Sequence, residues 1–259
     1  MSQNTTNPVF VAVEGPIGVG KSALIDALEK EYGKNGIRTF KEELELDRTQ
    51  LDRFYGDKKK FAFQTQIAFL LSRYKQYEDM QKILKQPEMF PADLLSAPNS
   101  NPKLFVTDFI FEKNDIFAEL TIEDEQEWKL YQKMREVLGE SAKNFAKPNL
   151  IVYLRAGEET LYRRIQNRHQ QTIQLNLQSG ICDGFKGITH EYLKQLAALY
   201  DRYFFHYKTS QILIIDVNNT DFVHTEHAAV SPISVIIDAI KKAIDSPLGQ
   251  NTYIKLDEK

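Results

Sequence analysis

The stretch that decides the fold reads GPIGVGKS and runs from Gly15 to Ser22. Two glycines stand five positions apart and are followed by Lys and Ser, which is the P-loop pattern. An apolar run of strand type, Val9 to Val13, precedes the motif, and a helical pattern from Lys21 to Tyr32 follows it. This strand–loop–helix context is the one in which a P-loop forms.

A P-loop is a cradle for phosphate groups. Its glycines let backbone N–H groups turn inward, and the start of the following helix adds partial positive charge. Lys21 is expected to reach the β- and γ-phosphates of a nucleotide such as ATP, and Ser22 to bind Mg²⁺. The motif does not name the phosphate acceptor, because kinases, GTPases and motor ATPases share it. The expected phosphate-binding residues are Gly15, Pro16, Ile17, Gly18, Val19, Gly20, Lys21 and Ser22.

Short apolar runs alternate with helical patterns along the rest of the chain. Strands are expected at 9–13, 37–40, 104–106, 150–154 and 212–217, and helices at 21–32, 60–84, 124–138, 158–168 and 189–203. Strand–helix–strand order requires crossover connections and therefore a parallel sheet. The sequence thus predicts an α/β fold, a P-loop three-layer sandwich with five parallel strands flanked by helices. We expect one domain over 1–259, with a lid at about 163–187 and a mobile tail at about 246–259.

The composition excludes several classes of protein. Hydrophobic residues make up 42% and charged residues 27% of the 259 residues, and the net charge is −3. This is ordinary globular composition, without the basic surface of a duplex nucleic-acid binder. One cysteine permits no intramolecular disulfide, and no apolar run approaches the roughly 18 residues that span a bilayer. With no signal peptide at the start, the cytoplasm is the expected location.

Features beyond the P-loop argue against a GTPase. The chain lacks the Asn-Lys-x-Asp tetrapeptide that reads guanine, and the third strand ends in Val106-Thr107-Asp108-Phe109 without a glycine to sense the γ-phosphate. Arg-rich sequence near residue 164 also suggests a lid over the nucleotide.

Four stretches together resemble the P-loop deoxynucleoside kinases, most closely the bacterial enzymes that phosphorylate purine deoxynucleosides. They are GPIGVGKS, FYGDKKKFAFQTQIAFLLSRY, TDFIFEKNDIFA and EYLKQLAALYDRYFFHY. The likeness runs from about Phe10 to Phe222. It implies transfer of phosphate from ATP, with Mg²⁺, to the 5′-hydroxyl of deoxyadenosine or deoxyguanosine. It also implies a homodimer and a role in nucleotide salvage.

The resemblance assigns roles on the acceptor side. Glu43 matches the general base that accepts the proton of the 5′-hydroxyl, with Glu42 as the alternative. Gln64 matches the glutamine that pairs with the base edge, since an amide offers both a donor and an acceptor. Tyr55 matches a tyrosine that contacts the sugar. Arg73 is expected to contact base or sugar, or to form a structural salt bridge.

The segment after the third strand departs from the family pattern. Asp108 can supply a carboxylate on the Mg²⁺ side, but the arginine that many members carry next is absent. Lys113 is the candidate replacement that reaches the phosphates. Among several aromatic residues, Phe111 is the first candidate for stacking on the base.

A basic helix supplies the expected lid. Arg164 and Arg168 stand four residues apart, so both face one side of a helix, from which they can clamp phosphates. The family often has a further arginine near Gln170, and this chain has none. An insertion from Gln171 to Gly187 follows, and no role is assigned to it.

Two other functions compete with this interpretation. A nucleoside monophosphate kinase of thymidylate type would need extra basic residues for the phosphate of its acceptor. An inactive nucleotide-binding accessory subunit would explain the missing arginine and the altered lid.

Overall fold

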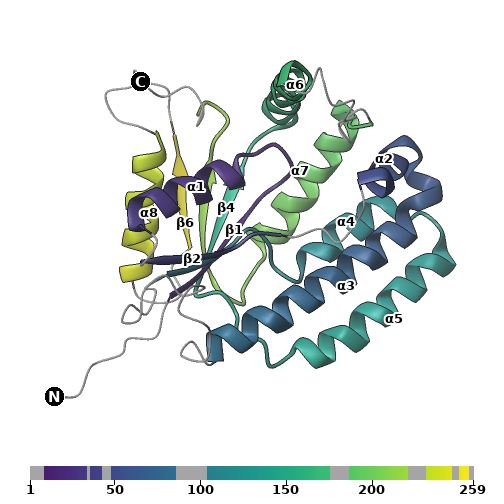
Figure 1. The fold of residues 1–259 in the computed structure, drawn as a ribbon, viewed down its shortest axis with the longest axis horizontal. Helices are drawn as coiled ribbons and strands as arrows, with labels where there is room; N and C mark the ends of the chain where they lie inside the picture. Colours follow the sequence, from purple (N-terminus) through teal and green to yellow (C-terminus); the bar gives the residue numbers. More distant parts are fainter. Residues whose placement is uncertain are drawn as a thin grey trace.

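The sheet has six parallel strands, and the computed structural model describes residues 9–33, 36–42, 48–85, 104–175, 187–220, 232–246 and 251–256. The strand order is β2-β3-β1-β4-β5-β6 (Figure 1). The chain leaves β1 toward β2, and passes from β3 to β4 on the other side of β1. Ligands of open parallel sheets bind at such a reversal, outside the carboxyl ends of the strands. The strands are β1 (Val9–Glu14), β2 (Ile37–Phe40), β3 (Leu104–Thr107), β4 (Leu150–Arg155), β5 (Gln211–Asp216) and β6 (Thr252–Lys255).

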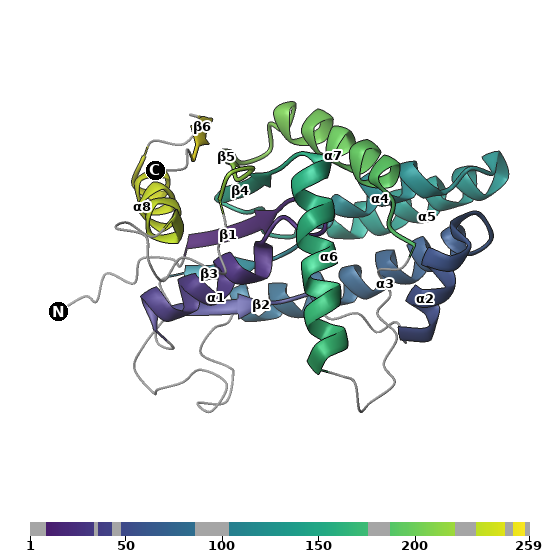
Figure 2. The same ribbon diagram turned by 90° about the horizontal axis from the view of Figure 1, so that it is seen from above.

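Eight helices are described, and they cover both faces of the sheet. Helices α1 and α8 lie on one face, and α3, α4, α5 and α7 lie on the other (Figure 1). Helix α6 packs on α7, and in the view from above it runs from α7 past the end of α1 (Figure 2). The helices are α1 (Lys21–Tyr32), α2 (Arg48–Gly56), α3 (Lys58–Lys85), α4 (Lys113–Thr121), α5 (Glu125–Ala142), α6 (Glu158–Leu175), α7 (His190–Phe205) and α8 (Pro232–Asp245).

Local sequence sets where several helices begin and end. The Asp124 side chain caps α5 by accepting hydrogen bonds from the backbone N–H groups of Gln126 and Glu127. The Thr189 side chain caps α7 in the same way through the N–H of Tyr192. Gly33 ends α1 with a φ of 66°, which is the left-handed region that favours glycine.

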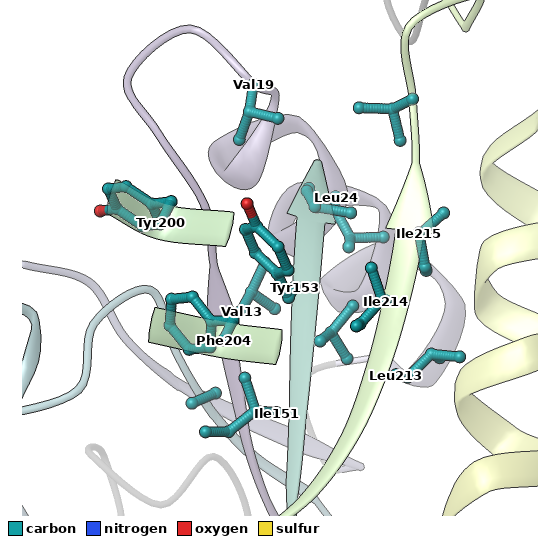
Figure 3. Close-up of a cluster of buried hydrophobic side chains, with 14 of the residues drawn as sticks. Val13, Val19, Leu24, Ile151, Tyr153, Tyr200, Phe204, Leu213, Ile214 and Ile215 are labelled. Atoms are coloured by element: carbon teal, nitrogen blue, oxygen red, sulfur yellow. The ribbon is translucent and has the colours of Figure 1, made fainter. Parts of the chain in front are cut away.

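The central strands are buried on both faces, as parallel strands between two helical layers must be. Figure 3 shows this core, where Tyr153 from β4 packs beside Tyr200 and Phe204 from α7 and close to Val19 of the P-loop. The core therefore reaches up to the loop that carries the phosphate cradle. A second apolar cluster joins β3 to α3 and α5.

The prediction of five strands is wrong, because Thr252–Lys255 adds a parallel edge strand beside β5. This strand is short and largely exposed, so it lacks the apolar run by which a strand is found in sequence. It lies in the polar segment that we predicted to be a mobile tail. Helices α2, α4 and α8 were also not predicted. Within the described ranges, no helix combines the length and apolar character needed to cross a membrane.

Candidate active site

The P-loop sits at the carboxyl end of β1, and two of its glycines are required by close contacts. Gly15 has a φ of 149°, and a Cβ there would lie 2.4 Å from the carbonyl oxygen of Leu154. Gly18 has a φ of 83°, and a Cβ there would lie 2.8 Å from the Ile165 side chain of α6. Both positions therefore need glycine. The loop packs against β4 on one side and against the predicted lid helix on another.

Lys21 folds back over the loop that it follows. Its Nζ donates to the carbonyl oxygens of Gly15 at 2.7 Å and Pro16 at 3.3 Å. Burial, and then the like charge of Lys113, lower the pKa of Lys21 to about 8. The ammonium thus lies inside the cradle, where its positive charge would attract a bound polyphosphate.

A hydrogen bond links the ends of β2 and β3. The N–H of Glu42 donates to Oδ1 of Asp108 at 2.6 Å. The Glu42 carboxylate receives hydrogen bonds from Arg73 of α3 on Oε1 and, at 3.1 Å, from Nζ of Lys113 on Oε2. Arg73 also donates to Oδ1 of Asn114. Three elements distant in sequence therefore meet at one carboxylate.

The charged side chains around Glu42 are largely buried. The side chains of Arg73 and Lys113 are each 4% exposed, and that of Glu42 is 16% exposed. Burial raises the pKa of Glu42, but the charges of Arg73 and Lys113 outweigh it and lower the pKa to about 2. Glu42 is therefore ionised at neutral pH. Of the two roles predicted for Arg73, the structure shows the salt bridge.

Two other residues that were predicted to bind the phosphate acceptor lie on α2 and α3. Burial, and then the negative charge of Glu42, raise the pKa of Tyr55 to about 12, so the phenol stays neutral and lies within the field of that carboxylate. Gln64 is exposed on α3, whereas Gln66, two residues on, is buried and donates to Thr121. Of the two glutamines, Gln64 is the one whose amide faces solvent.

Phe111 lies in an apolar environment. It is 5% exposed and belongs to the second apolar cluster, where its ring packs edge-on against Tyr74 at 6.2 Å between centroids. The guanidinium of Arg135 lies 4.5 Å from its centroid. The ring thus joins the turn after β3 to α3 and α5, and its stacking on a base stays a prediction.

The two predicted lid arginines have different surroundings. Arg164 is half-buried and donates through Nη1 to the carbonyl oxygen of Val19 at 2.9 Å. Its Nη2 donates to the carbonyl oxygens of Val217, at 2.8 Å, and Thr220 after β5. Arg168, one turn further along α6, is exposed. Arg164 therefore ties the P-loop to the β5–α8 segment.

Sequence reasoning missed Glu14, the last residue of β1. It is fully buried, and its carboxylate accepts hydrogen bonds from the N–H of Ile110 at 2.8 Å and of Gly15 at 3.2 Å. Burial raises the pKa of Glu14, against the opposing charges of Lys113 and Lys21. An acidic residue that ends an apolar strand directly before the first P-loop glycine was the available indication.

Some predictions fall on residues that the structure does not describe. Glu43, the preferred general base, is one of them, and most of the insertion, residues 176–186, is another. Ser22 is described and is exposed at the first turn of α1. Among the described residues, no group of three or more His, Cys, Asp or Glu side chains could hold a metal ion.

The fold and the phosphate cradle define a P-loop nucleotide-binding protein. The chain belongs to the deoxynucleoside kinase family, whose model matches residues 11–244. The comparison confirms the family predicted from the sequence. The chain is accordingly a kinase that uses a nucleoside triphosphate and phosphorylates a deoxynucleoside.

Several named proteins are similar to this chain. Deoxyguanosine kinase from Bacillus subtilis (strain 168) is 35% identical over 160 residues, which cover 61% of this chain and 66% of that protein. Deoxyguanosine kinase from Lactobacillus acidophilus is 27% identical over 95% of this chain and 98% of that protein. A solved structure of deoxyadenosine kinase from M. mycoides with bound dATP has a TM-score of 0.64 at 18% identity, over 92% of this chain and 100% of that chain. The structural likeness confirms the α/β fold.

Proposed function

We propose that the protein transfers the γ-phosphate of ATP to the 5′-hydroxyl of deoxyguanosine or deoxyadenosine. One observation carries the proposal: the Lys21 ammonium and the Glu42 carboxylate lie at the same carboxyl edge of the sheet, where Glu42 attracts Lys21 and also binds Lys113. Lys21 would hold the donor phosphates, and the Glu42 region would hold the hydroxyl that attacks them. The purine preference is supported by the names of the relatives.

Catalysis at this site would consist of positioning and charge stabilisation. In phosphoryl transfer the transition state is loose, and negative charge spreads over the oxygens of the transferring group. Lys21 at the end of the P-loop and Lys113 at the start of α4 would supply positive charge, so Lys113 would replace the arginine that many family members carry. This role for Lys113 argues against the inactive accessory subunit.

A carboxylate at the end of β2 would accept the proton of the hydroxyl. The sequence favours Glu43, whereas the described geometry supports Glu42, which lies among Lys113, Arg73 and the field of Tyr55. A carboxylate with a pKa of about 2 is a weak base, but it can still orient a hydroxyl whose proton leaves late in a loose transition state.

The donor set also suits Mg²⁺. Ser22 and Asp108 offer the hydroxyl and carboxylate oxygens that hard cations prefer, and Mg²⁺ sites of this type use few protein ligands. When bound, the ion would neutralise charge on the β- and γ-phosphate oxygens. Arg164 would contribute indirectly, by fixing Val19 of the cradle against the segment after β5.

A panel of acceptors tests the substrate. Deoxyguanosine, deoxyadenosine, deoxycytidine, thymidine and dTMP are each incubated with ATP and Mg²⁺, and ADP release and product mass are measured. We expect the purine deoxynucleosides to be consumed fastest. Consumption of dTMP alone would establish the monophosphate kinase instead, and tight ATP binding without turnover would establish the accessory subunit.

Paired variants identify the base. Glu43→Gln should keep ATP binding and lower turnover by about 10² or more if Glu43 is the base, because general-base catalysis contributes this much. Near-normal turnover in Glu43→Gln with a loss of that size in Glu42→Gln would assign the role to Glu42.

We also propose that the enzyme is a cytoplasmic homodimer. The support is the family resemblance. Light scattering of the purified protein measures the mass directly, and a value of one chain, 30.0 kDa, at micromolar concentration would contradict the dimer.

A further inference from the structure

Glu14 is a buried acidic residue with defined hydrogen-bond partners. Its carboxylate has no exposed surface, and its two oxygens accept from two different loops. Oε2 accepts from Gly15, at the start of the phosphate cradle, and Oε1 accepts from Ile110, in the turn between β3 and α4. Burial of an ionised carboxylate is expensive unless it is paired and hydrogen-bonded, so its surroundings must offset that cost.

The turn that Glu14 holds carries Lys113. Ile110 makes two backbone hydrogen bonds in this turn: its N–H donates to Glu14, and its carbonyl oxygen accepts from the N–H of Lys113 at 3.2 Å, at the start of α4. The charges of Lys113 and Lys21 both act on the Glu14 carboxylate. These two ammonium groups repel each other across the site, and Glu14 lies where it attracts both.

We propose that Glu14 is a positioning residue, which fixes the β3–α4 turn to the P-loop and thereby holds Lys113 opposite Lys21. Both hydrogen-bond partners of its carboxylate are backbone N–H groups. This inference rests on the proposed phosphoryl transfer only for the role of Lys113. The attachment of the turn to β1 stands on the hydrogen bonds alone.

Hydrogen exchange tests the attachment without any turnover. Glu14→Leu removes the acceptor for the Ile110 N–H, and we expect the peptide covering 108–113 to exchange about five- to tenfold faster, as for one lost buried hydrogen bond. Glu14→Gln keeps an acceptor oxygen and should change this exchange less. Unaltered exchange of 108–113 in Glu14→Leu would overturn the proposal, even if the enzyme proved to have another substrate.

A double-mutant cycle tests the route through Lys113. Glu14→Gln should lower kcat at least tenfold while KM for ATP stays the same or falls, because a negative charge behind the phosphate site is removed. In a Lys113→Met background the same change should alter kcat less than twofold, since its effect acts through the missing ammonium. Equal effects in both backgrounds would overturn the proposal. Glu119→Gln, a surface acid on α4, serves as the control that leaves kcat unchanged.

Discussion

Replacement of Glu42 by Gln should destabilise the fold as well as impair the enzyme. The substitution keeps the shape of the side chain and removes its charge. It therefore leaves Arg73 and Lys113, each 4% exposed, without the anion that both contact. Removal of one partner from a buried ion pair is much more damaging than loss of a surface pair, because the remaining charge stays buried and uncompensated.

The pKa of Glu42 gives the size of the effect. It falls from an ordinary 4.5 to about 2, because the charges of Arg73 and Lys113 outweigh the effect of burial. At 1.36 kcal/mol per pKa unit, this shift corresponds to about 3 kcal/mol of stability. The loss on breaking a buried pair is also about 3 to 5 kcal/mol. We therefore expect Glu42→Gln to lower the free energy of unfolding at pH 7 by about 3 kcal/mol.

The sign of the pH dependence follows from the depressed pKa. The folded state holds the carboxylate ionised more strongly than the unfolded chain does. Its contribution is therefore complete above pH 4.5 and is lost as the pH falls from 4.5 toward 2. The difference between wild type and Glu42→Gln should shrink by about 1.4 kcal/mol for each pH unit in that range.

Urea denaturation at a series of pH values from 7 to 3 measures this difference. Glu125→Gln is the control, since Glu125 forms an exposed pair with Lys129 and its loss should change stability by less than about 1 kcal/mol. The reasoning is refuted if Glu42→Gln matches the control at pH 7, or if its destabilisation is constant across the series.

Two further predictions concern the neighbouring elements. Gly187→Ala should raise KM for the acceptor about tenfold, because the new Cβ would lie 2.0 Å from the carbonyl oxygen of Tyr55 and would displace α2. Gly56→Ala, where a Cβ meets nothing within 4 Å, should leave KM unchanged. Steady-state kinetics of both variants measure KM, and equal values of KM for the two variants would contradict this prediction. Arg164→Ala should weaken ATP binding at least tenfold, because it removes the hydrogen bonds from Arg164 to the cradle and to Val217 after β5. Calorimetry measures the affinity, and a larger loss in a variant of the exposed Arg168, Arg168→Ala, would contradict this.

The sequence by itself determined the phosphate cradle, the α/β class and five of the six described strands. These follow from local physics: glycines at fixed spacing permit the turn, and short apolar runs between helical patterns indicate strands, most of them buried on both faces. The same reasoning could not find β6, whose residues are exposed and polar, because its pairing is decided by the free edge of β5. The order of the strands likewise lies beyond a pattern read along the chain.

Only the tertiary structure decided which charges meet. Glu42, Arg73 and Lys113 come from the end of β2, the middle of α3 and the start of α4, and no spacing in the sequence requires them to share a site. The structure likewise showed that Phe111 packs in an apolar cluster and that Glu14 is a buried carboxylate directly before the cradle. From sequence alone, a charged side chain is expected to be exposed to solvent. Its specific role depends on burial beside other charges, which only the folded chain brings about.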